Sequence, residues 1–209
     1  MTYNLFYHNE SNNNIFKNPL TFIDSLSGRK HIVLYYDNHE FGRKIQYRFV
    51  KNGLLNAECC IYSIHQGDNV TEIKKEMITN DIDVEHFIKR GLLKIFKIPN
   101  IMKHSQDVLK GSKEIVDRML ADVNPAKSFR MVIRMIDKLN TKDQITANLK
   151  LEQYYHSKFD SFNGMVLCHY DTIDCPIKAN NKWIETILAN HHSVIFVTEK
   201  SAEGIAFDT

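Results

Sequence analysis

Short runs of apolar residues alternate with amphipathic stretches along most of the chain. Six runs have the length and composition of buried strands: residues 31–36, 58–64, 92–98, 129–136, 164–170 and 193–198. Between these runs, apolar residues recur at helical spacing, which predicts helices over residues 40–55, 70–80, 84–90, 105–121, 146–159 and 181–189. Because strands and helices alternate, we predict a three-layer α/β fold with at least five strands in a mostly parallel sheet and helices on both faces.

The beginning of the chain is more polar than the rest. Ser11-Asn-Asn-Asn14 favours neither helix nor strand, whereas Pro19 suits the first turn of a short helix. We therefore predict an N-terminal arm over residues 1–28 and a single domain over residues 29–209. Residues 199–209 have no predicted element.

Composition narrows the possible partners. The chain has 27 basic and 25 acidic residues and a net charge of +2, without a basic stripe, so we expect no direct contact with nucleic acid. No apolar stretch approaches the ~20 residues of a membrane helix, and no signal peptide is visible at the start. Four cysteines without a Cys-x-x-Cys pair favour free thiols in a cytoplasmic protein. We expect no structural zinc and no other metal or cofactor.

The loop after the first strand is the usual phosphate site of parallel α/β proteins. Here it reads Tyr36-Asp-Asn-His-Glu-Phe-Gly-Arg-Lys44, and only Gly42 and Lys44 resemble a phosphate-binding loop. The first glycine is absent, no Ser or Thr follows the lysine, and two acidic side chains would repel phosphate. This loop argues against a nucleotide-hydrolysing enzyme. Asp37 and Asn38 are expected to cap the following helix.

The fifth predicted strand ends in a second group of candidate residues. Alternation places Cys168 and Tyr170 on one side of the strand and His169 on the other. Asp171 follows, either to open a turn or to contact a ligand. Cys168 is expected to be a soft wall of a pocket, with no sign of a reactive thiolate.

Two further candidates stand alone in the sequence. His31 begins the first strand, away from the expected crevice, where a histidine is most often structural. Glu152 lies in the middle of a helix. If its face is turned inward, the carboxylate must be paired or protonated; the sequence alone favours the outward, solvated position. No catalytic set can be derived from the spacing.

The order of several segments resembles the MEDS domain, the methanogen/methylotroph DcmR sensory domain. The segments are His31-Ile-Val-Leu-Tyr-Tyr-Asp, Glu40, Gly53-Leu-Leu-Asn-Ala-Glu-Cys-Cys-Ile-Tyr62, Asp83-Val-Glu, Gly91-Leu-Leu-Lys-Ile, Leu151-Glu-Gln-Tyr-Tyr, Val166-Leu-Cys-His-Tyr-Asp171 and Ile187-Leu-Ala-Asn-His191. The resemblance covers residues 29–198. Val33 and His192 depart from it, since the family usually has a cysteine and a proline at these positions.

The resemblance implies a RecA/KaiC-like fold without a working phosphate loop. It also implies a sensory role in prokaryotic signalling or transcription control, with small hydrocarbon derivatives as ligands. A signalling or transcription protein would be the partner, and a homodimer is an open alternative to a monomer. Carried over by position, the ligand-binding candidates are His31, Tyr36, Glu40, Glu152, Cys168, Tyr170, Asp171 and His191.

We expect the ligand to bind at the carboxyl edge of the sheet, where Tyr36 and Glu40 would converge with Cys168, Tyr170 and Asp171. In the alternative, both tyrosines are core aromatics. Two other functions remain open: a degenerate KaiC- or RecA-type nucleotide-binding protein or ATPase relative, and a protein-interaction adaptor without a ligand.

Overall fold

The computed structural model describes residues 17–124, 127–172, 181–198 and 201–209. Within these ranges one seven-stranded sheet has the order β3-β2-β4-β5-β1-β6-β7. Its strands are β1 (Lys30–Tyr36), β2 (Cys59–Ile64), β3 (Leu93–Lys97), β4 (Phe129–Ile133), β5 (Gly164–Asp171), β6 (Ser193–Thr198) and β7 (Ser201–Asp208). Neighbours from β3 to β6 pair in parallel, and only β7 runs antiparallel, to β6. The predicted mainly parallel α/β fold is confirmed.

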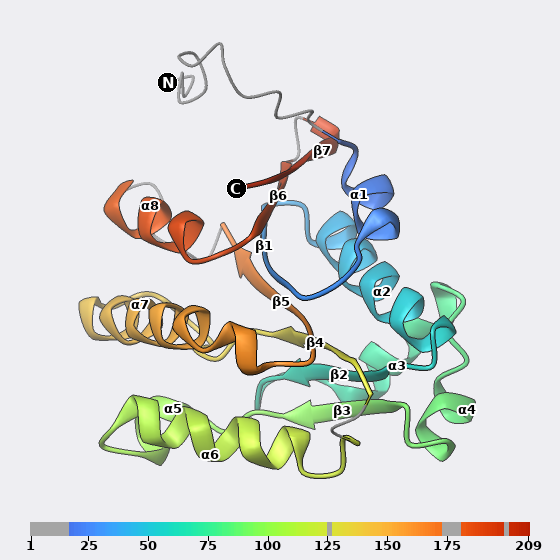
Figure 1. Ribbon diagram of the computed structural model, residues 1–209, viewed down its shortest axis with the longest axis horizontal. Helices are drawn as coiled ribbons and strands as arrows, with labels where there is room; N and C mark the ends of the chain where they lie inside the picture. The colour runs from blue at the N-terminus through green and yellow to red at the C-terminus, as the bar shows by residue number, and fades with distance from the viewer. Residues whose placement is uncertain (1–16, 125–126, 173–180, 199–200) are drawn as a thin grey trace.

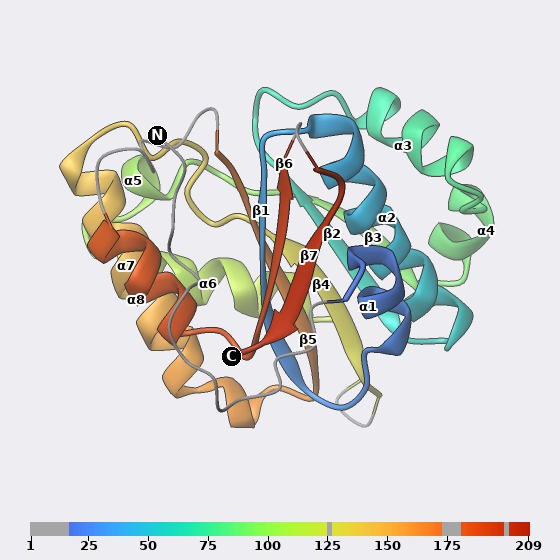
Figure 2. The same ribbon diagram turned by 90° about the horizontal axis from the view of Figure 1, so that it is seen from above.

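Helices cover both faces of this sheet (Figures 1 and 2). They are α1 (Pro19–Ser25), α2 (His39–Leu55), α3 (Val70–Thr79), α4 (Val84–Lys89), α5 (Ile101–His104), α6 (Val108–Leu120), α7 (Lys142–Ser157) and α8 (Asn181–Ala189), with a short 3₁₀ turn, η1 (Phe159–Ser161). Residues of α1 to α4 bury their apolar sides in one core and residues of α5 to α8 in a second core on the opposite face. The prediction of three layers is confirmed.

Capping residues explain where several helices begin. The Asn38 side chain accepts a hydrogen bond from Phe41 N and starts α2, as the sequence predicts. Thr141 and Gln144 form a reciprocal capping box, so α7 begins at Lys142, ahead of the predicted start at residue 146. The single helix predicted over residues 105–121 is wrong: Ser105 is extended, and Asp107 caps a separate α6.

Strand β1 lies inside the sheet, between β5 and β6. Its alternation sends Val33 and Tyr35 into the core under α5 to α8, and Leu34 and Tyr36 into the opposite core. In the β1–β5 ladder Val33 is the partner of Cys168. The first strand and β5 therefore place their side chains next to each other under α7.

The two ends of the described chain also pack on the sheet. Helix α1, within the arm predicted over residues 1–28, contributes buried Phe22 and Ile23 to the core on its side. Residues 1–16 of the predicted arm lie outside the described residues. The unassigned C-terminal stretch is the edge strand β7, and Thr209 follows it with hydrogen bonds to the backbone carbonyls of His191 (2.5 Å) and His192 (3.1 Å). No helix in the described ranges has the length and apolarity to cross a membrane.

Candidate functional site

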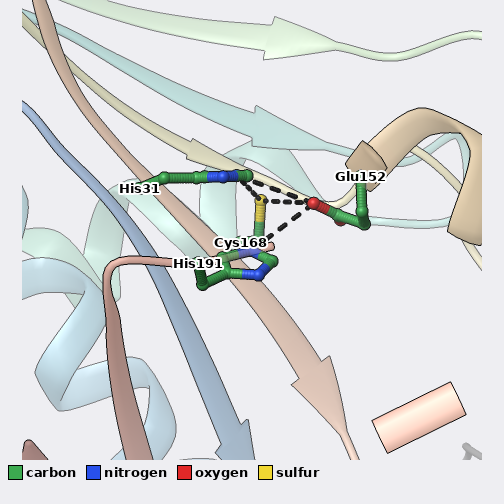
Figure 3. A group of neighbouring side chains, drawn as sticks. All are labelled: His31, Glu152, Cys168 and His191. Atoms are coloured by element: carbon green, nitrogen blue, oxygen red, sulfur yellow. Dashed lines mark hydrogen bonds and ion pairs between the residues drawn. The ribbon is translucent and has the colours of Figure 1, made fainter. Parts of the chain in front are cut away.

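Four side chains of metal-ligand type meet in the core beneath α7. His31 comes from the start of β1, Cys168 from β5, Glu152 from α7 and His191 from the connection between α8 and β6. All four are buried, and one nitrogen, oxygen or sulfur atom from each lies within 4.8 Å of the other three. Figure 3 shows the four side chains pointing toward a common centre.

The separations within this cluster are short. Glu152 Oε2 lies 3.4 Å from His191 Nε2 and 3.6 Å from His31 Nε2. Cys168 Sγ lies 3.4 Å from His31 Nε2 and 3.7 Å from Glu152 Oε2. The two imidazole rings stack, with centroids 3.9 Å apart. Glu152 Oε2 thus contacts both imidazoles and the thiol.

A chain of hydrogen bonds holds the Glu152 carboxyl group from behind. Trp183 Nε1 donates to Asn148 Oδ1 (3.0 Å), and Asn148 Nδ2 donates to Tyr170 Oη (2.8 Å). Tyr170 Oη in turn donates to Glu152 Oε1. Because Oε1 is engaged by the tyrosine, Oε2 is the oxygen that faces the cluster.

The orientation of His191 is also fixed. Its Nδ1 lies 2.7 Å from the carbonyl oxygen of Ile187. A carbonyl only accepts hydrogen bonds, so Nδ1 carries the proton and Nε2 presents a lone pair. That Nε2 atom is buried and has no hydrogen-bond partner in the described part of the chain.

Burial sets the charge of the cluster. Loss of hydration raises the pKa of Glu152 to about 7, although hydrogen bonds from Tyr170 and Cys168 oppose the shift. Burial, together with the neighbouring Glu152, raises the pKa of the Cys168 thiol well above its usual range. Burial lowers the pKa of His191 to about 3 and that of His31 well below 6.5. Both imidazoles are therefore neutral near pH 7, and their contacts with Glu152 are not ion pairs.

A small apolar cavity of about 40 Å³ borders the cluster. His31, Glu152 and Cys168 form part of its wall, together with Tyr155, whose hydroxyl donates to Ser112 Oγ. The other lining residues are apolar and come from β4 and the segment after it, from β5, α6 and α7, and from the turn after α7: Val116, Met131, Ile133, Met135, Leu151, Phe159, Phe162 and Val166. An engineered apolar cavity of about 150 Å³ accommodates benzene. Scaled by volume from that case, a cavity of about 40 Å³ holds a molecule of about two heavy atoms without rearrangement.

The shared pocket predicted for Tyr36 and Tyr170 is wrong. Tyr36 belongs to the core under α1 to α4 and Tyr170 to the core under α5 to α8, so the sheet separates them. Tyr36 Oη instead lies 3.3 Å from Nδ1 of His169, which points to the same side. Cys168 and Tyr170 do share one face, as strand alternation predicts.

The remaining candidates lie away from the buried cluster. Asp171, at the end of β5, contacts His39 at the start of α2 (3.2 Å between Oδ2 and Nε2). Glu40 is exposed in the first turn of α2 and borders a surface hollow. The structure therefore unites His31, Glu152, Cys168 and His191, with Tyr170 behind them, and separates Tyr36, Glu40 and Asp171 from this group.

The solvated position favoured for Glu152 is also wrong, because the residue is only 7% exposed. A signal was present: Asn148 and Glu152 are four residues apart and lie with Leu151 on the inner stripe of α7. Polar residues on an apolar stripe indicate a buried polar network. The cluster also lies toward the amino ends of β1 and β6, since His31 is the second residue of β1 and His191 precedes β6.

The fold and site define a RecA/KaiC-like α/β protein with a buried polar cluster. A KaiC-like protein from the hyperthermophilic archaeon Pyrococcus horikoshii OT3 has a similar structure, with a TM-score of 0.57 and 12% identity over 85% of this chain and 76% of that chain. At that identity the likeness shows the fold alone. No curated protein matches the sequence. Residues 30–198 match the family described as the MEthanogen/methylotroph, DcmR Sensory domain. The chain belongs to this MEDS family, and membership supports a sensory or regulatory role.

Proposed function

We propose that the protein is a sensory domain that binds a small, weakly polar organic molecule in the cavity beside the His31–Glu152–Cys168–His191 cluster. The observation that carries this proposal is the combination of an apolar cavity of about 40 Å³ with three polar groups on one wall. Apolar walls favour a hydrocarbon part, and a few placed polar groups orient a polar substituent. A hydrocarbon derivative with one or two carbons has this chemistry and about this size.

Occupancy of such a site would serve as a signal and not as a step of catalysis. Membership of a sensory family supports this part of the proposal. The output would pass to a signalling or transcription partner protein. The ligand site would be on the α7 side of the sheet, and the carboxyl edge would not be needed for recognition.

The alternative function, nucleotide binding, finds less support in the loop after β1. A β-carbon on Gly42 would lie 2.6 Å from the Tyr36 ring, so this glycine is needed for close packing against Tyr36. A packing requirement explains the glycine without a phosphate. Asp37 and Glu40 still disfavour a triphosphate in this loop.

Ligand-observed NMR with dichloromethane, methanol and magnesium ATP as separate probes tests the proposal. We expect saturable binding of at least one of the two organic probes and none of ATP. The variant Val116→Ile adds one methylene to the cavity wall and should weaken that binding by about tenfold or more. The variant Val70→Ile makes the same change at the exposed start of α3 and serves as the matched control.

Two outcomes would refute the proposal. One is the absence of saturable binding of both organic probes. The other is equal binding by the Val116→Ile and Val70→Ile variants, which would place the probe outside the cavity. Saturable stabilisation by magnesium ATP would support the alternative function.

A further inference from the structure

We propose that His31 Nε2, Glu152 Oε2, Cys168 Sγ and His191 Nε2 bind one divalent transition-metal cation of the zinc type. The first argument is the convergence of electron pairs. The lone pair of His191 Nε2 and an oxygen of Glu152 face each other at 3.4 Å. The His31 nitrogen and the Cys168 sulfur lie beside the same oxygen. A cation at the common centre would be a shared partner for all four atoms, including His191 Nε2, which has no hydrogen-bond partner in the described part of the chain.

The second argument is distance. Tetrahedral zinc has bonds of about 2.0–2.1 Å to histidine nitrogen, 2.0–2.2 Å to carboxylate oxygen and 2.3 Å to sulfur. These bonds place nitrogen and oxygen ligands about 3.4 Å apart, and sulfur about 3.6 Å from either. The cluster has separations of 3.4 and 3.6 Å between Glu152 Oε2 and the two imidazoles, and 3.4 and 3.7 Å from Cys168 Sγ to its two neighbours. Four of the six separations among the ligand atoms are therefore close to those of tetrahedral zinc, and the other two are at most 4.8 Å.

The third argument is charge. A thiolate and a carboxylate carry two negative charges, which a divalent cation balances in a buried site. On binding, the proton of the Cys168 thiol leaves to solvent and a sulfur–metal bond replaces the S–H bond; where the Glu152 carboxyl group is protonated, its proton leaves as well and an oxygen–metal bond replaces the O–H bond. Two imidazoles with one thiolate suit zinc-type ions better than magnesium or calcium, which prefer oxygen ligands only.

The fourth argument is the support behind the ligands. The Ile187 carbonyl holds the proton of His191 Nδ1, and Tyr170 holds the far oxygen of Glu152. Metal-binding histidines and carboxylates usually have such partners, which fix the tautomer and the orientation. Cys168 by itself would be a lone buried cysteine; here it is one of four groups from four separate segments that meet at one point.

Equilibrium dialysis with zinc, followed by a cobalt(II) titration, tests the proposal on the full chain without a histidine tag and with a phosphine reductant. We expect one equivalent of metal per chain. Cobalt(II) should give the intense visible bands of tetrahedral coordination and a sulfur-to-cobalt charge-transfer band. Magnesium should not compete.

Three variants assign the site. Cys168→Ser should abolish the charge-transfer band, and Glu152→Gln should retain that band but weaken zinc binding by at least about 100-fold. Cys60→Ser is the matched control, because Cys60 is also a buried strand cysteine and its hydroxyl replacement can still donate to the Val50 carbonyl. Its metal binding should equal that of the parent. Amide NMR spectra establish that each variant is folded.

The proposal is overturned by substoichiometric binding, by cobalt spectra without a sulfur band, or by equal binding in the Cys168→Ser and parent proteins. These results are independent of the proposed sensory function. Metal binding without saturable binding of an organic probe would retain the metal site and refute the sensory proposal. Saturable binding of an organic probe by a protein that takes up no metal would refute the metal site and retain the sensory proposal.

Discussion

Replacing Tyr170 with phenylalanine tests the hydrogen-bonded chain behind the cluster. The change removes one hydroxyl group and no other heavy atom. The structure gives that hydroxyl two partners: it accepts from Asn148 and donates to Glu152, and the residue is 1% exposed. The substitution therefore leaves both partners buried with an unmet hydrogen bond.

The expected cost follows from these two bonds. A hydrogen bond to a charged group contributes about 1.5–3 kcal/mol and a neutral one about 0.5–1.5 kcal/mol. We expect Tyr170→Phe to lower the free energy of unfolding by about 2–4 kcal/mol. For a domain of this size the melting temperature should fall by about 4–16 °C.

Urea unfolding followed by circular dichroism, with a chelator present, measures this free energy directly. Tyr155→Phe is the matched control, since within the described residues the partly buried Tyr155 hydroxyl has a hydrogen bond to Ser112 alone (3.1 Å). It should cost about 1 kcal/mol. If the two variants lose the same stability, or if Tyr170→Phe loses less than about 1 kcal/mol, the inference that this hydroxyl organises the site is wrong.

Three further changes should have distinct effects on stability. Gly164→Ala should destabilise the protein by about 2 kcal/mol or more, measured by urea unfolding, because the new β-carbon would lie 2.3 Å from the carbonyl oxygen of Phe129. Arg130→Ala should cost about 3–5 kcal/mol in the same assay, since it leaves the mostly buried Glu58 carboxylate without its 2.5 Å partner. Burial lowers the pKa of His65 below its ordinary value of 6.5, so the unfolded chain takes up a proton that the folded one resists. Its contribution is complete above about pH 6.5 and is lost as the pH falls, so His65→Asn should show a smaller loss of melting temperature between about pH 7.5 and pH 5 than the parent.

Local sequence patterns were sufficient to predict most of the fold. The apolar runs gave six strands, and the Asn38 cap and the helical spacing gave α2 close to its observed bounds. Antiparallel β7 was missed because its sequence, Ser201-Ala-Glu-Gly-Ile-Ala-Phe-Asp208, has no clear alternation, and its pairing with β6 is a tertiary effect. Helix α7 begins ahead of the predicted start because Thr141 and Gln144 cap its first turn reciprocally.

The site was harder to predict than the fold. Its four residues could be considered only one at a time, since His31, Glu152, Cys168 and His191 come from four segments separated by up to 160 positions in the numbering. Strand alternation gave the side of Cys168 and Tyr170 but not the position of α7 above them. Ligands of parallel α/β proteins usually bind at the carboxyl ends of the strands, and for this reason the predicted ligand site included Tyr36 and Asp171. Strand register and helix packing determine which side chains meet in such a cluster, and local sequence patterns predict neither of them.

The bonds from Thr209 to the carbonyls of His191 and His192 tie the end of β7 to the base of the cluster. His192 N also donates to His31 O (2.7 Å), so the same short segment joins two of the four cluster residues. A shift of either histidine must stretch these bonds or carry Thr209 along. The position of the edge strand β7 is thus mechanically coupled to the positions of the buried histidines, which solvent hardly reaches.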